Sequence, residues 1–257
     1  TDFWLLHGFR REKEIDGLLD RIPEFERLKA IFQPGHNLAN LYRHVMEMPQ
    51  EKVNEILTPL YNRLENENRE SAFKRDNPDF WALRAFKDFT EGSNLDRGVF
   101  SVYLLNLVNV KPGEIIYQGS GILHAYLEGV NMELMANSDN VLRGGLTPKH
   151  VDVPELMKHV TFESVIPQIL KPVKSNAVRS IVETPAPDFQ LSHLLIKSGQ
   201  QYEREAGMGP EIYFVFEGEV EVDGEFRFSK GEAFFIPDFA QVEMRGEGEL
   251  FCAGVPF

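Results

Sequence analysis

The chain has 257 residues, of which 42% are apolar, and a formal net charge of −13. This length and apolar content are enough for one large domain or two ordinary domains with a substantial core. The acidic balance excludes the broad basic surface that nucleic acid or an anionic membrane requires, while a local basic pocket for a small anion is compatible with it. We therefore expect neither nucleic acid nor a membrane as a partner.

Cysteine usage and apolar run lengths restrict the protein further. Cys252 is the single cysteine, which excludes an intrachain disulfide framework and a thiolate-rich metal site. No apolar run approaches the roughly 20 residues of a membrane-spanning helix, and the N-terminal residues lack the pattern of a signal peptide. The sequence predicts a cytoplasmic protein.

The first third of the chain has a helical pattern. Apolar residues recur at helical spacing from about residue 12 to residue 89, and prolines at 23, 34, 49 and 78 interrupt the pattern. This predicts a block of about five short helices, and we assign residues 1–92 to a helical domain.

After Gly92-Ser93 the pattern changes to short β-branched and aromatic runs between turn residues, which is typical of a sandwich or barrel. The clearest expected strands before residue 140 are VFSVYLLNLVNV, EIIYQ and VNMELMA. The expected fold is mainly β with an α-helical domain. Its later parts are a first barrel portion over 93–152, a helix at 153–159 within a connection over 153–185, and a second, related barrel of the jelly-roll kind over 186–257.

His124 lies in the segment GSGILHAYLEG, directly after an expected strand. A single histidine among apolar residues is more often a satisfied core or rim side chain than a metal ligand. The residues that follow favour a functional role, because Glu133, Asp139, Arg143 and Lys149 all occur within the next 25 positions. Gly144-Gly145 places Arg143 on irregular backbone, where binding groups are often found. A structural alternative stays open, with Asp139 capping a turn and Arg143 pairing with Glu133.

The segment GILHAYLEGVNMELMANSDNVLRGGLTPKHVDVPEL resembles the signature region of the type I phosphomannose isomerases in their bacterial form, with HAY, ELMANSDNVLR and GLTPK in the same order and spacing. The similarity extends from Phe9-Arg10 to the C-terminal EGEVEV and KGEAFFIP runs. It implies cupin-type barrels with an inserted helical domain, the first barrel being the catalytic one and incomplete in this chain. It also implies zinc-assisted interconversion of mannose 6-phosphate and fructose 6-phosphate through an enediol.

The resemblance also assigns roles to single residues. His124 occupies the position of a zinc ligand, and Arg143 that of an active-site arginine which can also hold the substrate phosphate. Tyr126, Glu133, Asp139 and Lys149 match residues that line the sugar-phosphate cavity. Lys149 is suited to a phosphate, and Glu133 and Asp139 are both candidates for proton transfer, which the sequence does not rank.

The chain also departs from this family. The family's other three zinc ligands, a Gln-x-His pair and a glutamate, lie upstream of the segment that corresponds to Thr1. We therefore expect the chain to be a C-terminal portion of an isomerase whose partner is its own upstream segment. The alternative is a non-catalytic cupin module that binds a sugar phosphate or a protein, and the sequence indicates no oligomeric state.

Overall fold

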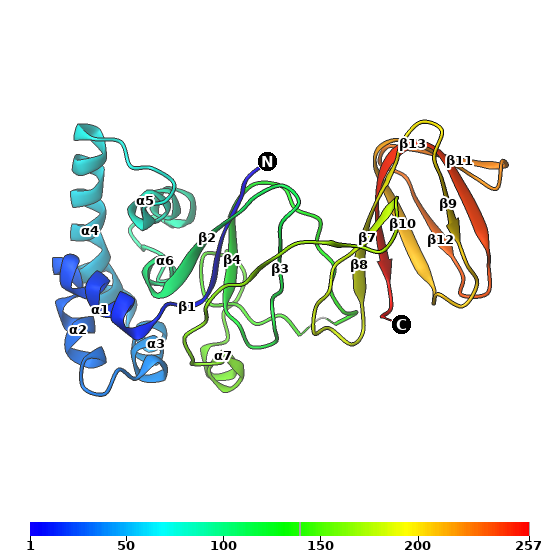
Figure 1. The fold of residues 1–257 in the computed structure, drawn as a ribbon. Coiled ribbons are helices and arrows are strands. Elements are labelled where there is room, and N and C mark those ends of the chain that lie inside the picture. The colour runs from blue at the N-terminus through cyan, green and yellow to red at the C-terminus, as the bar shows by residue number, and fades with distance from the viewer. Residues whose placement is uncertain (139, 257) are drawn as a thin grey trace. The chain divides into compact units, whose positions relative to one another are not determined.

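The computed structural model describes residues 1–138 and 140–256 and divides the chain into two compact units (Figure 1). The first unit consists of residues 1–110, 118–129 and 140–168. The second contains the described parts of 111–117, 130–139 and 169–257. Between residues 110 and 169 the chain alternates between the two units, so neighbouring stretches of sequence belong to different units.

Five α-helices follow one another in the first unit, as the periodicity predicted. They are α1 Glu12–Arg21, α2 Glu26–Phe32, α3 Leu38–Glu47, α4 Gln50–Glu70 and α5 Pro78–Phe89, with a 3-10 turn η1 at Pro23–Phe25. Asn37 and Asn77 cap α3 and α5, because their side chains accept hydrogen bonds from Asn40 N at 2.8 Å and Asp79 N at 3.0 Å. Each helix buries one apolar face in a common core.

A three-stranded antiparallel sheet packs against these helices. Strand β1, Phe3–Phe9, lies in the middle, between β2, Leu105–Val110, and β4, His124–Glu128. One face, which carries Trp4, Leu6 and Ala125, joins the helical core. On the opposite face His7 is aligned with Asn106 of β2 and with His124 of β4.

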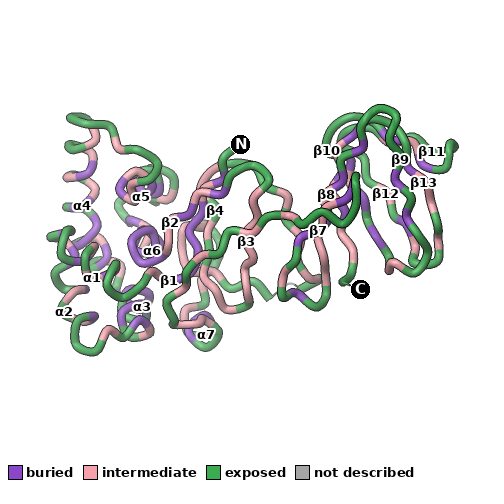
Figure 2. The backbone as a smooth tube through the Cα atoms, in the orientation of Figure 1, coloured by how far each residue is buried: buried purple, intermediate pink, exposed green. Residues whose placement is uncertain are grey.

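Two of the expected strands are different in the structure. Val99–Leu104, the first half of the run VFSVYLLNLVNV, forms helix α6, in which all six residues are buried (Figure 2). A segment that is apolar on every side satisfies a fully buried helix as well as a strand, so packing decides between them. Residues 130–136, the expected strand VNMELMA, form no regular element. The expected helix at 153–159 is present as α7, Val153–His159, capped by the Asp152 side chain.

The second unit is almost entirely antiparallel sheet. Its strands are β3 Ile115–Ile116, β5 Ile169–Leu170, β6 Val173–Lys174, β7 Arg179–Ile181, β8 Gln190–Ile196, β9 Gln201–Arg204, β10 Glu211–Val222, β11 Phe226–Ser229, β12 Ala233–Ile236 and β13 Val242–Gly254. The main sheet has the order β11-β10-β13-β8-β7-β6, with β12 on β10 and β9 on β13. Alternate residues such as Tyr213, Val215 and Val220 form its core. The predicted fold class, helices combined with antiparallel cupin-type sheet, is confirmed.

A buried ion network holds this second core together. Glu211 Oε2 accepts hydrogen bonds from Arg204 Nε at 2.8 Å and from the Tyr213 hydroxyl at 2.7 Å, and its Oε1 lies 2.7 Å from an Arg179 nitrogen. The side chains of these ion-paired residues are at most 3% exposed. Arg204 also donates to backbone carbonyls of Glu205, Asp238, Ala240 and Gly209, which joins loops at one end of the sheet.

The network stabilises the charged form of Glu211. Burial by itself raises a carboxyl pKa, but the hydrogen bonds from Tyr213 and Arg204 and the charge of Arg179 outweigh it, so the pKa of Glu211 is lowered. The resulting stabilisation is complete above the ordinary carboxyl range and is lost as the pH falls through the lowered value.

Replacing Glu211 with Gln should lower the free energy of unfolding of the second unit by about 3–5 kcal/mol, because two buried arginines then lose their counter-charge. Urea unfolding at neutral pH and below pH 4 measures this loss, and the variant should show a weaker acid dependence than the wild type. Glu219→Gln on the same strand is the matched control. Glu219 forms an exposed pair with Arg227, so it should cost about 0–1 kcal/mol. Equal losses in the two variants would contradict this account.

Candidate functional site

His124 begins strand β4, and its side chain is exposed. Its Nδ1 lies 2.9 Å from the carbonyl oxygen of Ile122. Because a carbonyl oxygen only accepts, Nδ1 carries the proton and donates this hydrogen bond. The neutral ring then has its lone pair on Nε2, which is the form in which histidine binds a metal while a backbone carbonyl orients it.

Tyr126 lies two positions further along β4 and therefore on the same face as His124. The two ring centroids are 6.0 Å apart, and the Tyr126 ring packs edge-on against Phe3 with centroids at 5.2 Å. The Tyr126 hydroxyl donates to Gln118 Oε1 at 3.0 Å. With 42% of the residue exposed, Tyr126 is accessible beside His124.

Several contacts fix the strand that carries these two side chains. Gly8 N donates to the Leu123 carbonyl at 2.7 Å just before His124. At the other end, Glu128 accepts from Arg75 at 2.7 Å and from Arg84 at 2.6 Å, which ties β4 to α5 and to the loop before it. The strand is thus held at both ends within the first unit.

Arg143 is half-buried and precedes a glycine pair that fits tightly against the helical block. A Cβ on Gly144 would lie 2.6 Å from the Tyr42 hydroxyl, and one on Gly145 would lie 2.7 Å from Gly98 Cα. Gly145 also has a φ of +112°, which side-chain-bearing residues rarely adopt.

The remaining predicted site residues are distributed over both units. Lys149 is exposed in the first unit, and its backbone N–H donates to Thr147 Oγ1 at 3.2 Å. Glu133 is exposed and belongs to the second unit. Asp139 lies outside the described residues. The structure therefore brings His124 and Tyr126 together on one strand and places Arg143 and Lys149 on one loop of the same unit.

The sequence assigned no role to His7, which the structure places next to His124. The two residues are directly opposite in the β1–β4 register, so their side chains share one face of the sheet. His7 is only 4% exposed. The alternation of the run FWLLHGF, together with the pairing of these two strands, is the signal that would have identified it.

Within residues 1–138 and 140–256, no group of three or more His, Cys, Asp or Glu side chains is arranged to hold a metal ion. No helix in this described part of the chain is both long and apolar enough to cross a membrane.

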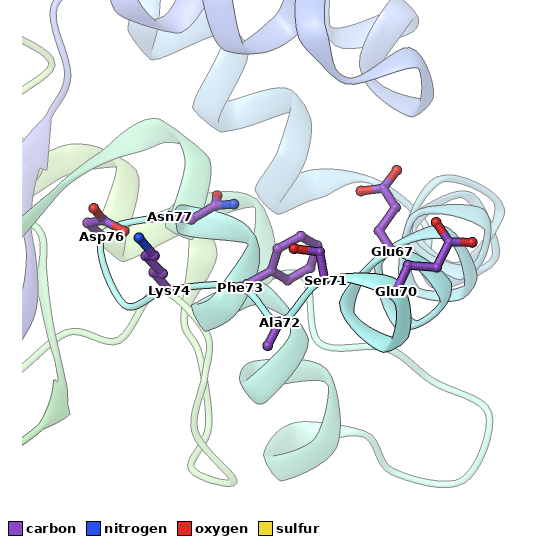
Figure 3. Close-up of a pocket in the computed structure, with 8 residues that line it drawn as sticks. All are labelled: Glu67, Glu70, Ser71, Ala72, Phe73, Lys74, Asp76 and Asn77. Atoms are coloured by element: carbon purple, nitrogen blue, oxygen red, sulfur yellow. The ribbon is translucent and has the colours of Figure 1, made fainter.

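A surface hollow lies where α4 ends and the chain turns toward α5 (Figure 3). It is lined by Glu67, Glu70, Ser71, Ala72, Phe73, Lys74, Asp76 and Asn77. None of the described predicted site residues is among these lining residues.

Replacing Gly145 with Ala should lower the thermal stability of the first unit and expose residues 141–150 to proteases. The added methyl group would collide with the backbone at Gly98, and the alanine would have to keep a positive φ. Together these two effects cost more than about 1 kcal/mol. Gly92→Ala is the matched control, because Gly92 also has a positive φ, +62°, but has nothing within 4 Å of the added Cβ. Limited proteolysis of the two variants measures the difference. Similar cleavage rates would mean that close packing does not hold this loop.

Several known proteins are similar to the chain over nearly its whole length. No protein-family model matches the chain. The chain is 33% identical to mannose-6-phosphate isomerase of Escherichia coli, covering 97% of the chain and 63% of that protein. It is 29% identical to mannose-6-phosphate isomerase 2 of Arabidopsis thaliana, covering 99% of the chain and 61% of the relative. The chain thus spans a little under two thirds of the length of these curated relatives.

The solved structures give the same result. Mannose 6-phosphate isomerase of Salmonella typhimurium, bound to its substrate f6p and to zinc, superposes with a TM-score of 0.81 at 29% identity. That match covers all of this chain and 64% of the Salmonella chain. Because plant and bacterial relatives match about equally well, the bacterial form expected from the sequence stays a prediction. The chain is a homologue of the mannose-6-phosphate isomerases over nearly its whole length.

Proposed function

We propose that the protein carrying this chain interconverts mannose 6-phosphate and fructose 6-phosphate with the help of a zinc ion. The observation that carries the proposal is similarity to mannose-6-phosphate isomerases over 97–99% of the chain. A solved Salmonella relative is bound to zinc and to its substrate. The hydrogen bond from His124 Nδ1 to a backbone carbonyl adds independent support, because it prepares Nε2 as a zinc ligand.

His124 is the residue of this chain that we propose as a ligand. The described residues bring together no group of three or more His, Cys, Asp or Glu side chains that could hold a metal ion, so the other ligands are not assigned. A bound zinc ion supplies Lewis acidity, which polarises sugar oxygens and stabilises negative charge on them. The His124–Ile122 hydrogen bond fixes the ring orientation before any ligand arrives, which reduces the cost of binding.

The remaining roles follow from the chemistry of moving a proton between two adjacent carbons. An enediol pathway develops negative charge on a substrate oxygen, and a fixed guanidinium stabilises such charge through charge-assisted hydrogen bonds. Arg143 is proposed for this role or for holding the phosphate, and Lys149 for the phosphate. Tyr126 is proposed to line the sugar cavity beside His124.

Glu133 and Asp139 are proposed for proton transfer on the resemblance alone. The names of two solved Salmonella variants add an observation about residue types and spacing. In these variants a glutamate and an arginine ten positions apart are each replaced by alanine. Glu133 and Arg143 are the same two residue types at the same separation. This spacing supports a functional role for Glu133 and for Arg143.

We also propose that the protein works in the cytoplasm, in line with its single, buried cysteine. The proposed partner is a small sugar phosphate, as in the substrate-bound Salmonella relative. A coupled isomerase assay with elemental zinc analysis tests the main proposal. Binding of the sugar phosphate without conversion would instead favour a non-catalytic cupin module.

His124→Ala should abolish zinc retention and reduce isomerase activity to background, because metal affinity at a catalytic site depends on several ligands acting together. Zinc content after dialysis, measured beside turnover, checks this. His150→Ala is a suitable control, since His150 is an exposed histidine to which the resemblance gives no role. Full zinc content in the His124 variant would show that His124 is not a zinc ligand.

Arg143→Ala should lower turnover by roughly two or more orders of magnitude, the scale of losing one preorganised stabiliser of transition-state charge. Zinc content should stay the same, which separates this variant from that of His124. Steady-state kinetics with both sugar phosphates give the measurement. Near-normal turnover would return Arg143 to a structural role.

A further inference from the structure

The loop that carries Arg143 and Lys149 has a specific attachment to the helical block. Asp96 Oδ1 accepts two backbone hydrogen bonds, from Gly98 N at 2.6 Å and from Leu146 N at 3.1 Å. Leu146 lies 50 positions away in sequence and between the two basic residues. One carboxylate oxygen thus links the start of α6 to the middle of the loop.

The segment around Asp96 is itself fixed on both sides. Leu95 N donates to Asn54 Oδ1 of α4 at 3.1 Å, and Gln50 Nε2 donates to the Leu95 carbonyl at 2.9 Å. Arg97 donates to the Met46 carbonyl of α3. The Asp96 carboxylate therefore belongs to a rigid support and not to a mobile linker.

The loop side of the attachment leaves little room for movement. A Cβ on Gly98 would lie 2.6 Å from Leu146 N and 2.8 Å from Asp96 Oδ1. Leu146 has a φ of +53°, an uncommon conformation for a branched side chain that surrounding contacts must maintain. Because residues 141–149 contain no helix or strand, the hydrogen bond to Leu146 N is one of the contacts that define the path of the loop.

We propose that Asp96 is a positioning residue of the isomerase site, which acts by holding the 143–149 loop so that Arg143 and Lys149 are presented in one fixed geometry. This inference rests on the proposed isomerase function. Displacement of a catalytic group by about 1 Å can cost on the order of 100-fold in rate, so a single loop anchor is sufficient for a large effect.

The test compares Asp96→Ala with Asp96→Asn in the full-length, zinc-loaded protein. Asparagine keeps a side-chain oxygen that accepts from both backbone N–H groups, whereas alanine removes it. Asp96→Ala should lower kcat by about 10-fold or more, and Asp96→Asn should stay within about 3-fold of the wild type. Zinc content should be equal in the two variants.

A double-mutant cycle with Arg143→Ala separates positioning from a general loss of stability. If Asp96 positions Arg143, the loss of kcat caused by Asp96→Ala should be smaller in the Arg143→Ala background than in the wild type, because one of the two positioned groups is already absent. Full additivity of the two effects would overturn the inference. Amide hydrogen exchange over residues 143–149 should increase in Asp96→Ala and not in Asp96→Asn.

The outcomes for the inference and for the proposed function are distinct. An active wild type in which Asp96→Ala equals Asp96→Asn overturns the inference alone. A wild-type protein that holds zinc but does not isomerise either sugar phosphate overturns the proposed function, and with it the catalytic role of Asp96.

Discussion

The pairing of β1 on both of its edges is the constraint on which the first unit depends. This seven-residue strand hydrogen-bonds to β2 on one side and to β4 on the other. One of its faces completes the helical core through Leu6. Its opposite face carries His7, which lies directly opposite His124 in the β1–β4 register. Loss of this strand would remove the backbone pairing that positions His124, although Glu128 would still tie the far end of β4 to α5.

The sequence predicted the helices well and the sheet elements unevenly, for physical reasons. Helical periodicity is a local signal, so α1 to α5 were identified directly. Helix α6 was missed because its β-branched and aromatic residues are buried on all sides and show no period. The strand expected at 130–136 failed because a strand exists only where another strand accepts its hydrogen bonds, and this is not encoded locally.

The residues of the candidate site differ in the same way. Some were predicted from a local motif, and others depend on a partner that is distant in sequence. His124, Tyr126, Arg143 and Lys149 were identified because the resemblance is specific to those positions. His7 and Asp96 were not, since each becomes relevant through a partner that is distant in sequence. His7 lies 117 positions from His124, its partner in the sheet register, and Asp96 lies 50 positions from Leu146. Residue types suggest chemistry, whereas support for that chemistry is visible only in the fold.

The two units use the polar groups of their sheets in opposite ways. In the second, Arg179, Arg204 and Glu211 satisfy one another in the interior, so their charges are fully committed to holding the sheet and its loops. In the first, the polar groups on the face of β4 remain accessible, as the exposed His124 and Tyr126 show. Chemistry on a substrate requires polar groups that the protein orients while leaving at least one of their binding atoms available to a ligand. His124 meets this condition because its Nδ1 is used for orientation and its Nε2 is left for a ligand. This hydrogen-bonding pattern supports the proposed role of His124 as a zinc ligand.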